Sequence, residues 1–112
     1  MTSRAEIEGL FAALRRGKDL DPDGTLSWGY YFVDPDPARL QAAADVLTGA
    51  GYEFVEIFQD REDEESGRWR LQVVKAERHT ADSLEGRNAQ LAGFAARHGL
   101  AGFDGNDVGP AG

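Results

Sequence analysis

LSWGYYFVD, residues Leu26 to Asp34, is the stretch that decides the fold of this chain. Successive side chains of an extended strand point to opposite faces, so the stretch divides into Leu26, Trp28, Tyr30 and Phe32 on one face and Ser27, Gly29, Tyr31 and Val33 on the other. Large apolar groups on both faces predict a central strand that is covered above and below. We therefore expect its rings, Trp28, Tyr30, Tyr31 and Phe32, mainly to build two cores. Because Trp and Tyr also carry polar groups, an aromatic sheet face is suited to hold a partner as well.

Length and composition limit the classes of protein that the chain can belong to. Its 112 residues indicate a single domain spanning residues 1–112, with an N-terminal helix in residues 1–17 and the core in residues 25–104. The absence of cysteine excludes a disulfide framework, a thiolate metal site and cysteine catalysis. The first residues contain no apolar run long enough for a signal peptide or a membrane span. The sequence therefore predicts a soluble, cytoplasmic protein without a membrane partner.

Net charge indicates the kind of partner. The chain has 20 acidic and 12 basic residues, which give a formal net charge of -8. A negative surplus opposes the phosphate backbone of a nucleic acid and favours a basic protein surface. We therefore expect a basic protein partner and no direct contact with nucleic acid.

The first helix is expected over residues Ser3 to Arg16. Its apolar residues recur at helical spacing, and Gly17 is suited to end it. This apolar stripe needs a receiver, which is either the second face of the sheet or another subunit. We expect the helix to act as a lid over that second face, which would bury the aromatic rings of the strand.

The remaining elements follow from caps, breakers and periodicity. Asp36 as N-cap and Pro37 at the first helical position begin a helix that ends near residues 48–50. Thr80 caps a further helix that runs from Ala81 to His98, before Gly99. Alternating apolar residues predict strands over residues 52–59, 68–76 and 100–103, a hairpin loop over residues 60–67, and a turn over residues 104–107.

Without the first helix the predicted order is β-α-β-β-α-β, the split βαβ arrangement of ferredoxin-like folds. A right-handed crossover makes the first two strands parallel and leaves room for the third between them. The strand Leu26 to Asp34 then lies centrally, which agrees with its two apolar faces. The fold class predicted is an α+β sandwich of ferredoxin-like topology with an extra N-terminal helix.

Two acidic segments are the candidate partner-binding sites. The hairpin loop and the C-terminal turn together supply Asp60, Glu62, Asp63, Glu64, Glu65, Asp104, Asn106 and Asp107. Such clusters are suited to dock a basic partner. The competing interpretations are a solvated loop tip that blocks edge aggregation, and a tight turn in which Gly105 takes positive φ.

Metal binding and catalysis find little support in the residues. Asp19, Asp21 and Asp23 begin like a calcium loop, but Tyr30 stands where the bidentate Glu is needed, so a solvated turn explains the segment better. His79 beside the Thr80 cap could bind an anion at the helix N-terminus, although a structural role is favoured. A pocket near His79, Thr80 and Asp104 would support a small-ligand sensor or enzyme, which is the alternative function. We expect no cofactor, no metal and no enzymatic activity.

Several segments, taken in order, resemble the RraB family, regulators of ribonuclease E activity. They are DLDPDG, WGYYFVDPD, AGYEFVEIF, GRWRLQVVKAERHT, LAGFAARHGL and FDGNDVGP, and the resemblance spans Ser3 to Pro110. Asn106 departs from it, because the family often has Trp there. The resemblance implies a non-enzymatic, acidic protein that binds ribonuclease E, or another RNA-processing enzyme, outside the catalytic centre and damps RNA processing. A toxin-neutralising immunity protein would share this size, acidity and lack of catalysis.

Overall fold

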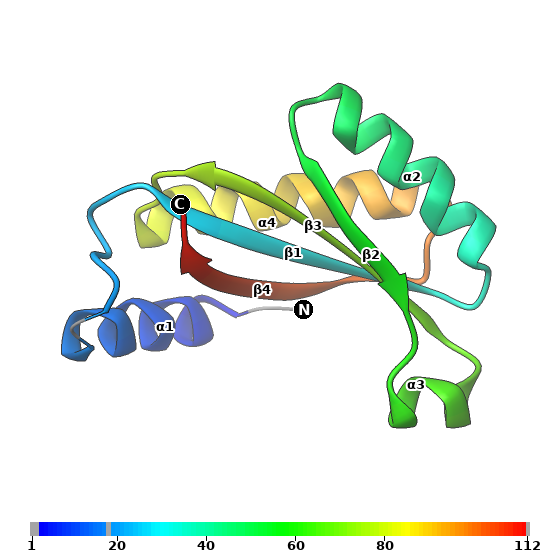
Figure 1. Cartoon of the computed structure of the whole chain (residues 1–112), viewed down its shortest axis with the longest axis horizontal. Helices are drawn as coiled ribbons and strands as arrows, with labels where there is room; N and C mark the ends of the chain where they lie inside the picture. The colour runs from blue at the N-terminus through cyan, green and yellow to red at the C-terminus, as the bar shows by residue number, and fades with distance from the viewer. Residues whose placement is uncertain (1–2, 18, 112) are drawn as a thin grey trace.

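The computed structural model describes residues 3–17 and 19–111 of the chain (Figure 1). Four helices and four strands make up this part. In chain order they are α1 (Arg4–Arg16), β1 (Leu26–Asp34), α2 (Pro37–Gly49), β2 (Glu53–Phe58), α3 (Arg61–Ser66), β3 (Trp69–Glu77), α4 (Ala81–Arg97) and β4 (Gly102–Pro110).

The four strands form one antiparallel sheet in the order β2-β3-β1-β4. This is the split βαβ topology predicted from the sequence, so the α+β, ferredoxin-like class is confirmed. β1 has the predicted bounds, and it lies between β3 and β4. Tyr30 stands opposite Val73 of β3, and Trp28 stands opposite Val108 of β4.

The local signals for α2 and α4 act as expected. The Asp36 side chain accepts a hydrogen bond from the amide of Ala38 at 2.9 Å, and Pro37 opens α2. Thr80 and Ser83 form a reciprocal capping box that begins α4. Each helix then places its apolar stripe on the same face of the sheet, α2 over β1, β2 and β3 and α4 over β4.

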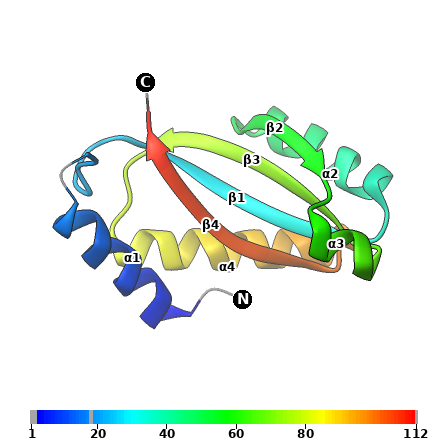
Figure 2. The same cartoon turned by 60° about the horizontal axis from the view of Figure 1, so that its bottom comes forward.

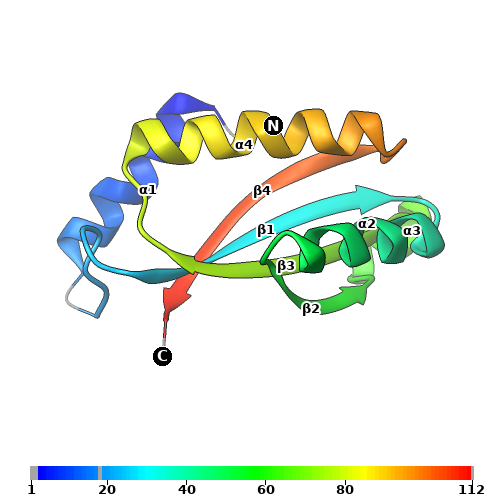
Figure 3. The same ribbon diagram turned by 90° about the horizontal axis from the view of Figure 1, so that it is seen from above.

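α1 does not cover the second face of the sheet, so that expectation is wrong. Figures 2 and 3 show it beside α4, on the helix side of the sheet. Arg4 pairs with Asp82 of α4 at 2.7 Å, and the Phe11 ring lies 5.6 Å from that of Trp28. The apolar stripe of α1 therefore extends the core that α4 already covers, where the bulky Trp28 offers it a surface.

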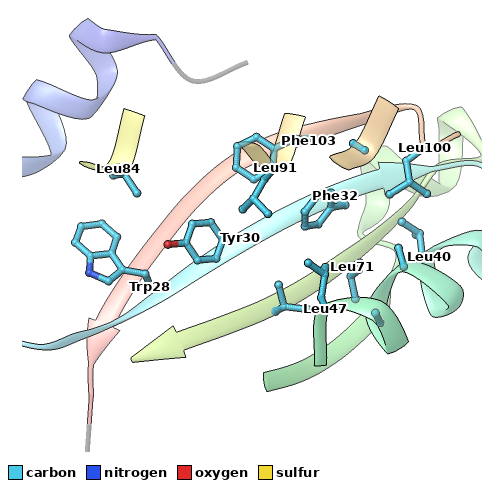
Figure 4. Packing of buried hydrophobic residues seen from close by; sticks show 14 of the residues in the cluster. Trp28, Tyr30, Phe32, Leu40, Leu47, Leu71, Leu84, Leu91, Leu100 and Phe103 are labelled. Atoms are coloured by element: carbon cyan, nitrogen blue, oxygen red, sulfur yellow. The ribbon is translucent and has the colours of Figure 1, made fainter. Parts of the chain in front are cut away.

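The chain builds one core rather than the two expected. Trp28, Tyr30 and Phe32 are fully buried in a single cluster with apolar residues from α1, α2, α4 and the other strands (Figure 4). Tyr31, on the other face of β1, is only half-buried. Because α1, α2 and α4 all contribute to this one cluster, the described part of the chain has no further long helix to cover the second face.

Two predicted irregular segments are regular in the structure. Residues 61–66 form α3 instead of a loop, because Asp60 caps the helix through the amide of Asp63 and Gly67 ends it with a φ of 72°. Residues 104–107 lie within β4 instead of turning away. Gly105 has the positive φ that was considered for it, 101°, but uses it in an irregular stretch where the register against β1 shifts.

Truncation of neighbouring residues on β1 tests the single core. We expect Phe32→Ala to lower the free energy of unfolding by about 3–5 kcal/mol, since it opens a cavity among buried rings. Tyr31→Ala should cost about 1 kcal/mol or less, because its ring faces outward. Urea unfolding of both variants measures this difference, and equal losses would indicate a second core under Tyr31.

Candidate functional site

The helix-free side of the sheet is the candidate functional site, and we call it the open face. In Figure 1 α4 lies behind the strands, so this face is turned toward the viewer. Residues paired across antiparallel strands share a face, and the register therefore assigns its members. They are Ser27, Gly29, Tyr31 and Val33 of β1, Glu53, Glu56 and Phe58 of β2, Arg70, Gln72, Val74 and Ala76 of β3, and Gly102, Asp107 and Gly109 of β4, joined by Asp104 through its contact with Arg70.

The open face is acidic. Glu53, Glu56, Asp104 and Asp107 are all exposed on it. Arg70 is its one basic member among the residues just named, and its guanidinium already pairs with Asp104 and with Asp63 of α3. A partner that approaches this side therefore meets Glu53, Glu56 and Asp107, whose carboxylates are not paired with Arg70.

Tyr31 is the aromatic centre of the open face. Its hydroxyl donates a hydrogen bond to Oδ2 of Asp107 at 3.3 Å. Partial burial raises the pKa of Tyr31, and the Asp107 carboxylate raises it further, so the hydroxyl stays protonated. Tyr31 thus presents an apolar ring with a polar tip, the combination that is enriched at the centres of protein interfaces.

A shallow hollow of about 160 Å³ lies next to Gly29, on the same strand as Tyr31. Its lining residues are Ser27, Gly29, Gln72, Val74 and residues 107–110. A Cβ atom on Gly29 would lie 3.2 Å from the Cβ of Asp107, which is closer than ordinary contact. Glycine at this position therefore keeps the hollow open and allows β1 and β4 to approach each other.

Arg70 joins α3 to one end of the open face. Its Nε donates to Oδ2 of the buried Asp63 at 2.7 Å, and the same guanidinium pairs with Asp104. Burial alone would raise the pKa of Asp63, but the Arg70 guanidinium holds it below its usual value. The acidic helix is thereby held beside the acidic face of the sheet.

The predicted binding residues divide into exposed and engaged groups. Those that remain exposed are Asp60, Glu62, Glu64, Glu65, Asp104 and Asp107. Asp63 is fully buried against Arg70 and so does not offer its carboxylate to a partner. Asn106 faces the helix side, where it exchanges two amide hydrogen bonds with Asn88 at 2.7 and 3.0 Å. For the exposed group, partner binding stays a prediction.

A buried polar network on the helix side was not anticipated. The Tyr30 hydroxyl donates to Oε2 of Glu77 at 2.8 Å and lies 2.9 Å from Nε2 of His79. Arg87 of α4 donates to both Glu77 carboxylate oxygens, at 2.7 and 3.0 Å. Nδ1 of His79 lies 2.9 Å from the Ser83 hydroxyl. These groups satisfy one another inside the fold, which confirms the structural interpretation of His79.

The proposed pocket near His79, Thr80 and Asp104 is not formed. His79 lies on the helix side, with its ring centre 5.3 Å from that of Trp28. Asp104 lies toward the other end of the sheet and pairs with Arg70 on the open face. The geometric basis of the small-ligand alternative is therefore absent.

The segment that begins like a calcium loop forms the turn that the sequence favoured for it. Asp21 accepts hydrogen bonds from the amides of Asp23 and Gly24, at 3.0 Å each, through its side chain and its carbonyl respectively. Lys18, at the start of the segment, lies outside the described residues. Over residues 3–17 and 19–111, no three His, Asp or Glu side chains gather as a metal-ligand set. In that same part of the chain, every helix is too short or too polar to cross a membrane.

The fold and this surface define an α+β sandwich with one uncovered, acidic sheet face. A family profile described as regulator of ribonuclease activity B matches residues 4–108. The chain therefore belongs to the RraB family, as its motifs indicated, and has the regulatory character of that family. A comparison with curated proteins yields no match.

The buried network makes stability depend on pH. Burial lowers the pKa of His79, and the Glu77 carboxylate only partly opposes this. An unfolded histidine, with an ordinary pKa of about 6.5, then binds a proton more readily than the folded one. Stability should be full above that value and fall as the pH drops from about 7 toward 5.

Thermal unfolding across this range measures the effect. Glu77 and Asp63, whose pKa values are lowered, stay ionised in the folded protein over this range, and their contribution to stability is lost mainly at lower pH. His79→Gln should flatten the pH dependence, and the matched control His98→Gln should retain it. If the stability of His79→Gln still depends on pH in this range, another titrating group causes the dependence.

Proposed function

We propose that this protein binds a basic region of ribonuclease E, or of another RNA-processing enzyme, through its open face and restrains RNA processing without catalysis. One observation carries the proposal: a member of the RraB family leaves one sheet face free of helices and lines it with carboxylates around Tyr31. Tyr31 and the hollow beside Gly29 supply the contact centre, and the acidic rim supplies the charge.

Electrostatics supports a protein partner of opposite charge. The open face carries Glu53, Glu56, Asp104 and Asp107, and α3 adds further exposed carboxylates at one end. Complementary charge speeds encounter and selects among partners more than it sets affinity. The same carboxylates repel a phosphate backbone, so the regulator is expected to act on the enzyme and not on its RNA.

A chain without catalytic machinery would regulate by occupying a surface of the enzyme. The titratable groups that resemble catalytic residues, His79, Glu77 and Tyr30, are committed to one another inside the fold. The exposed groups offer shape and charge for binding. The family resemblance implies that this interaction lies outside the catalytic centre of the ribonuclease.

Surface plasmon resonance with the host's ribonuclease E, including its non-catalytic region, measures both affinity and association rate and tests this function. We expect binding at low salt with an association rate that falls as salt increases. Tyr31→Ala together with Asp107→Asn should weaken binding at least about tenfold, since it removes the aromatic centre and its acidic neighbour. Glu8→Gln, an exposed acid on α1, serves as the control and should bind like the wild type.

A triple variant, Glu62→Gln, Glu64→Gln and Glu65→Gln, measures the share of α3 in the same assay. A smaller loss than that of the Tyr31 variant would make α3 a rim. The proposal fails if the wild type does not bind at low salt, or if the Tyr31 variant binds as tightly as the wild type.

A further inference from the structure

β2 is an edge strand with one side left without a strand neighbour. It is hydrogen-bonded to β3 alone, and in the sheet order it stands at the end. Its first four residues, 53–56, are all exposed. The backbone groups along such an edge can pair with another extended chain.

Exposed apolar side chains gather at this edge. In the part of the chain that the structure describes, three large hydrophobic side chains are exposed: Val46 at 49%, Phe54 at 41% and Val55 at 44%. Phe54 and Val55 are consecutive on β2, and Val46 is on α2, which runs beside β2 in Figure 1. Grouped exposure of this kind marks an interaction surface, unlike single exposed residues.

The two sides of β2 differ in chemistry. Glu53 and Glu56 stand opposite Val74 and Gln72, so they lie on the open-face side. Phe54 stands opposite the buried Val73, so it lies on the helix side. Lys75, on the neighbouring strand, is engaged over the Tyr52 ring at 5.0 Å and does not neutralise these acids. An added strand would therefore meet carboxylates on one side and apolar groups on the other.

Charge disfavours a second copy of this chain as the occupant. Antiparallel self-pairing that stacks Phe54 on Val55 of the other copy sets Glu53 opposite Glu56 at both ends of the contact. Like charges directly opposite each other destabilise a strand pair. The register shift between Phe54 and Glu56 also interrupts a regular ladder between two copies.

The opposite edge of the sheet is less suited to receive a strand. β4 contains Gly102, Gly105, Gly109 and Pro110, and its register shifts near Gly105. α1 approaches it, since one hollow is lined by Glu6 and Leu10 of α1 together with residues 104–106. Glycine, proline and bulges make the pairing of a further strand with an edge less favourable. Of the two edge strands, β2 is therefore better suited to receive a strand.

We propose that β2 receives an extended protein segment in which basic and aliphatic residues alternate, added as a fifth strand of the sheet. Its basic side chains would face Glu53 and Glu56, and its aliphatic side chains would lie against Phe54 and the exposed side of α2. This inference rests on the proposed function for the existence of a basic protein partner. The inference goes further than that function in two ways. It names β2 as the strand that binds the partner, and it specifies the alternating basic and aliphatic sequence that β2 would bind.

A synthetic peptide, acetyl-KVKVKVKV-amide, is the probe, and acetyl-KKKKVVVV-amide of the same composition is its control. In NMR titrations the alternating peptide should shift the β2 resonances and slow exchange of β2 amides, with cross-strand contacts between β2 and peptide. The block peptide should bind at least tenfold more weakly. Equal binding of the two peptides, or shifts centred on β4 or on Gly29 and Tyr31 of β1, would overturn the proposal.

Variants separate this edge from the centre of the open face around Tyr31 on β1. Phe54→Ser with Val55→Ser, and separately Glu53→Lys, should each weaken the alternating peptide at least tenfold. Tyr31→Ala is the control and should leave peptide binding unchanged. All these side chains are outside the core, and circular dichroism checks that the variants fold. Unchanged affinity in both β2 variants would overturn the proposal.

Two further outcomes are distinguishable. A concentration-dependent dimer of the wild type that Phe54→Ser with Val55→Ser abolishes would assign the edge to a second copy and overturn the inference. Ribonuclease binding that depends on Tyr31 while the peptide fails to reach β2 would end this inference and leave the proposed function intact. A peptide bound at β2 without any ribonuclease binding would instead count against the proposed function.

Discussion

The row of Trp28, Tyr30 and Phe32 along β1 is the contact on which the rest of the structure depends. These three side chains are fully buried: Trp28 meets α1, Phe32 meets α4 through Phe94, and α2 packs on the same strand and adds Leu40 and Leu47 to the same cluster. Burying large aromatic side chains contributes strongly to stability, since each removes a large apolar area from water. The helices therefore collect on one side of the sheet, and the other side remains open.

The open face follows from that one-sided packing. Its members are the side chains that alternate with the core row, so they come from the same strands and share their rigidity. Gly29 and Tyr31 lie directly between core residues of β1, and their positions are set by the buried neighbours. A binding surface on such a scaffold needs little ordering when a partner arrives, which lowers the entropic cost of association. Arg70 extends the surface by holding α3 at its end through Asp63.

Charge and topology together also decide which polar side chains are buried inside the fold and which are exposed to a partner. Glu77, Arg87 and His79 are polar groups that satisfy one another beneath the sheet, and they help to orient α4. Glu53, Glu56 and Asp107 lack such partners of opposite charge and face water. The acidity that was visible in the composition is therefore a property of the surface. It reaches the open face, the edge strand β2 and α3 alike.

Local signals in the sequence determined the elements and their order. The alternation of Leu26 to Asp34, the Asp36 and Thr80 caps and the positive φ of Gly105 each depend on a few neighbouring residues, and so they could be predicted. Family membership was readable for the same reason, since motifs are local. α3 was missed because its acidic composition suggested a solvated loop, although the Asp60 cap and Gly67 were present as signals.

Only the tertiary structure decided which face of β1 is covered, that Asn106 turns to Asn88, and that His79 joins Tyr30 and Glu77. Periodicity shows that α1 has an apolar stripe, but α4 and the open face were both possible receivers. The choice between them depends on the summed burial of all elements, which no short stretch of sequence contains.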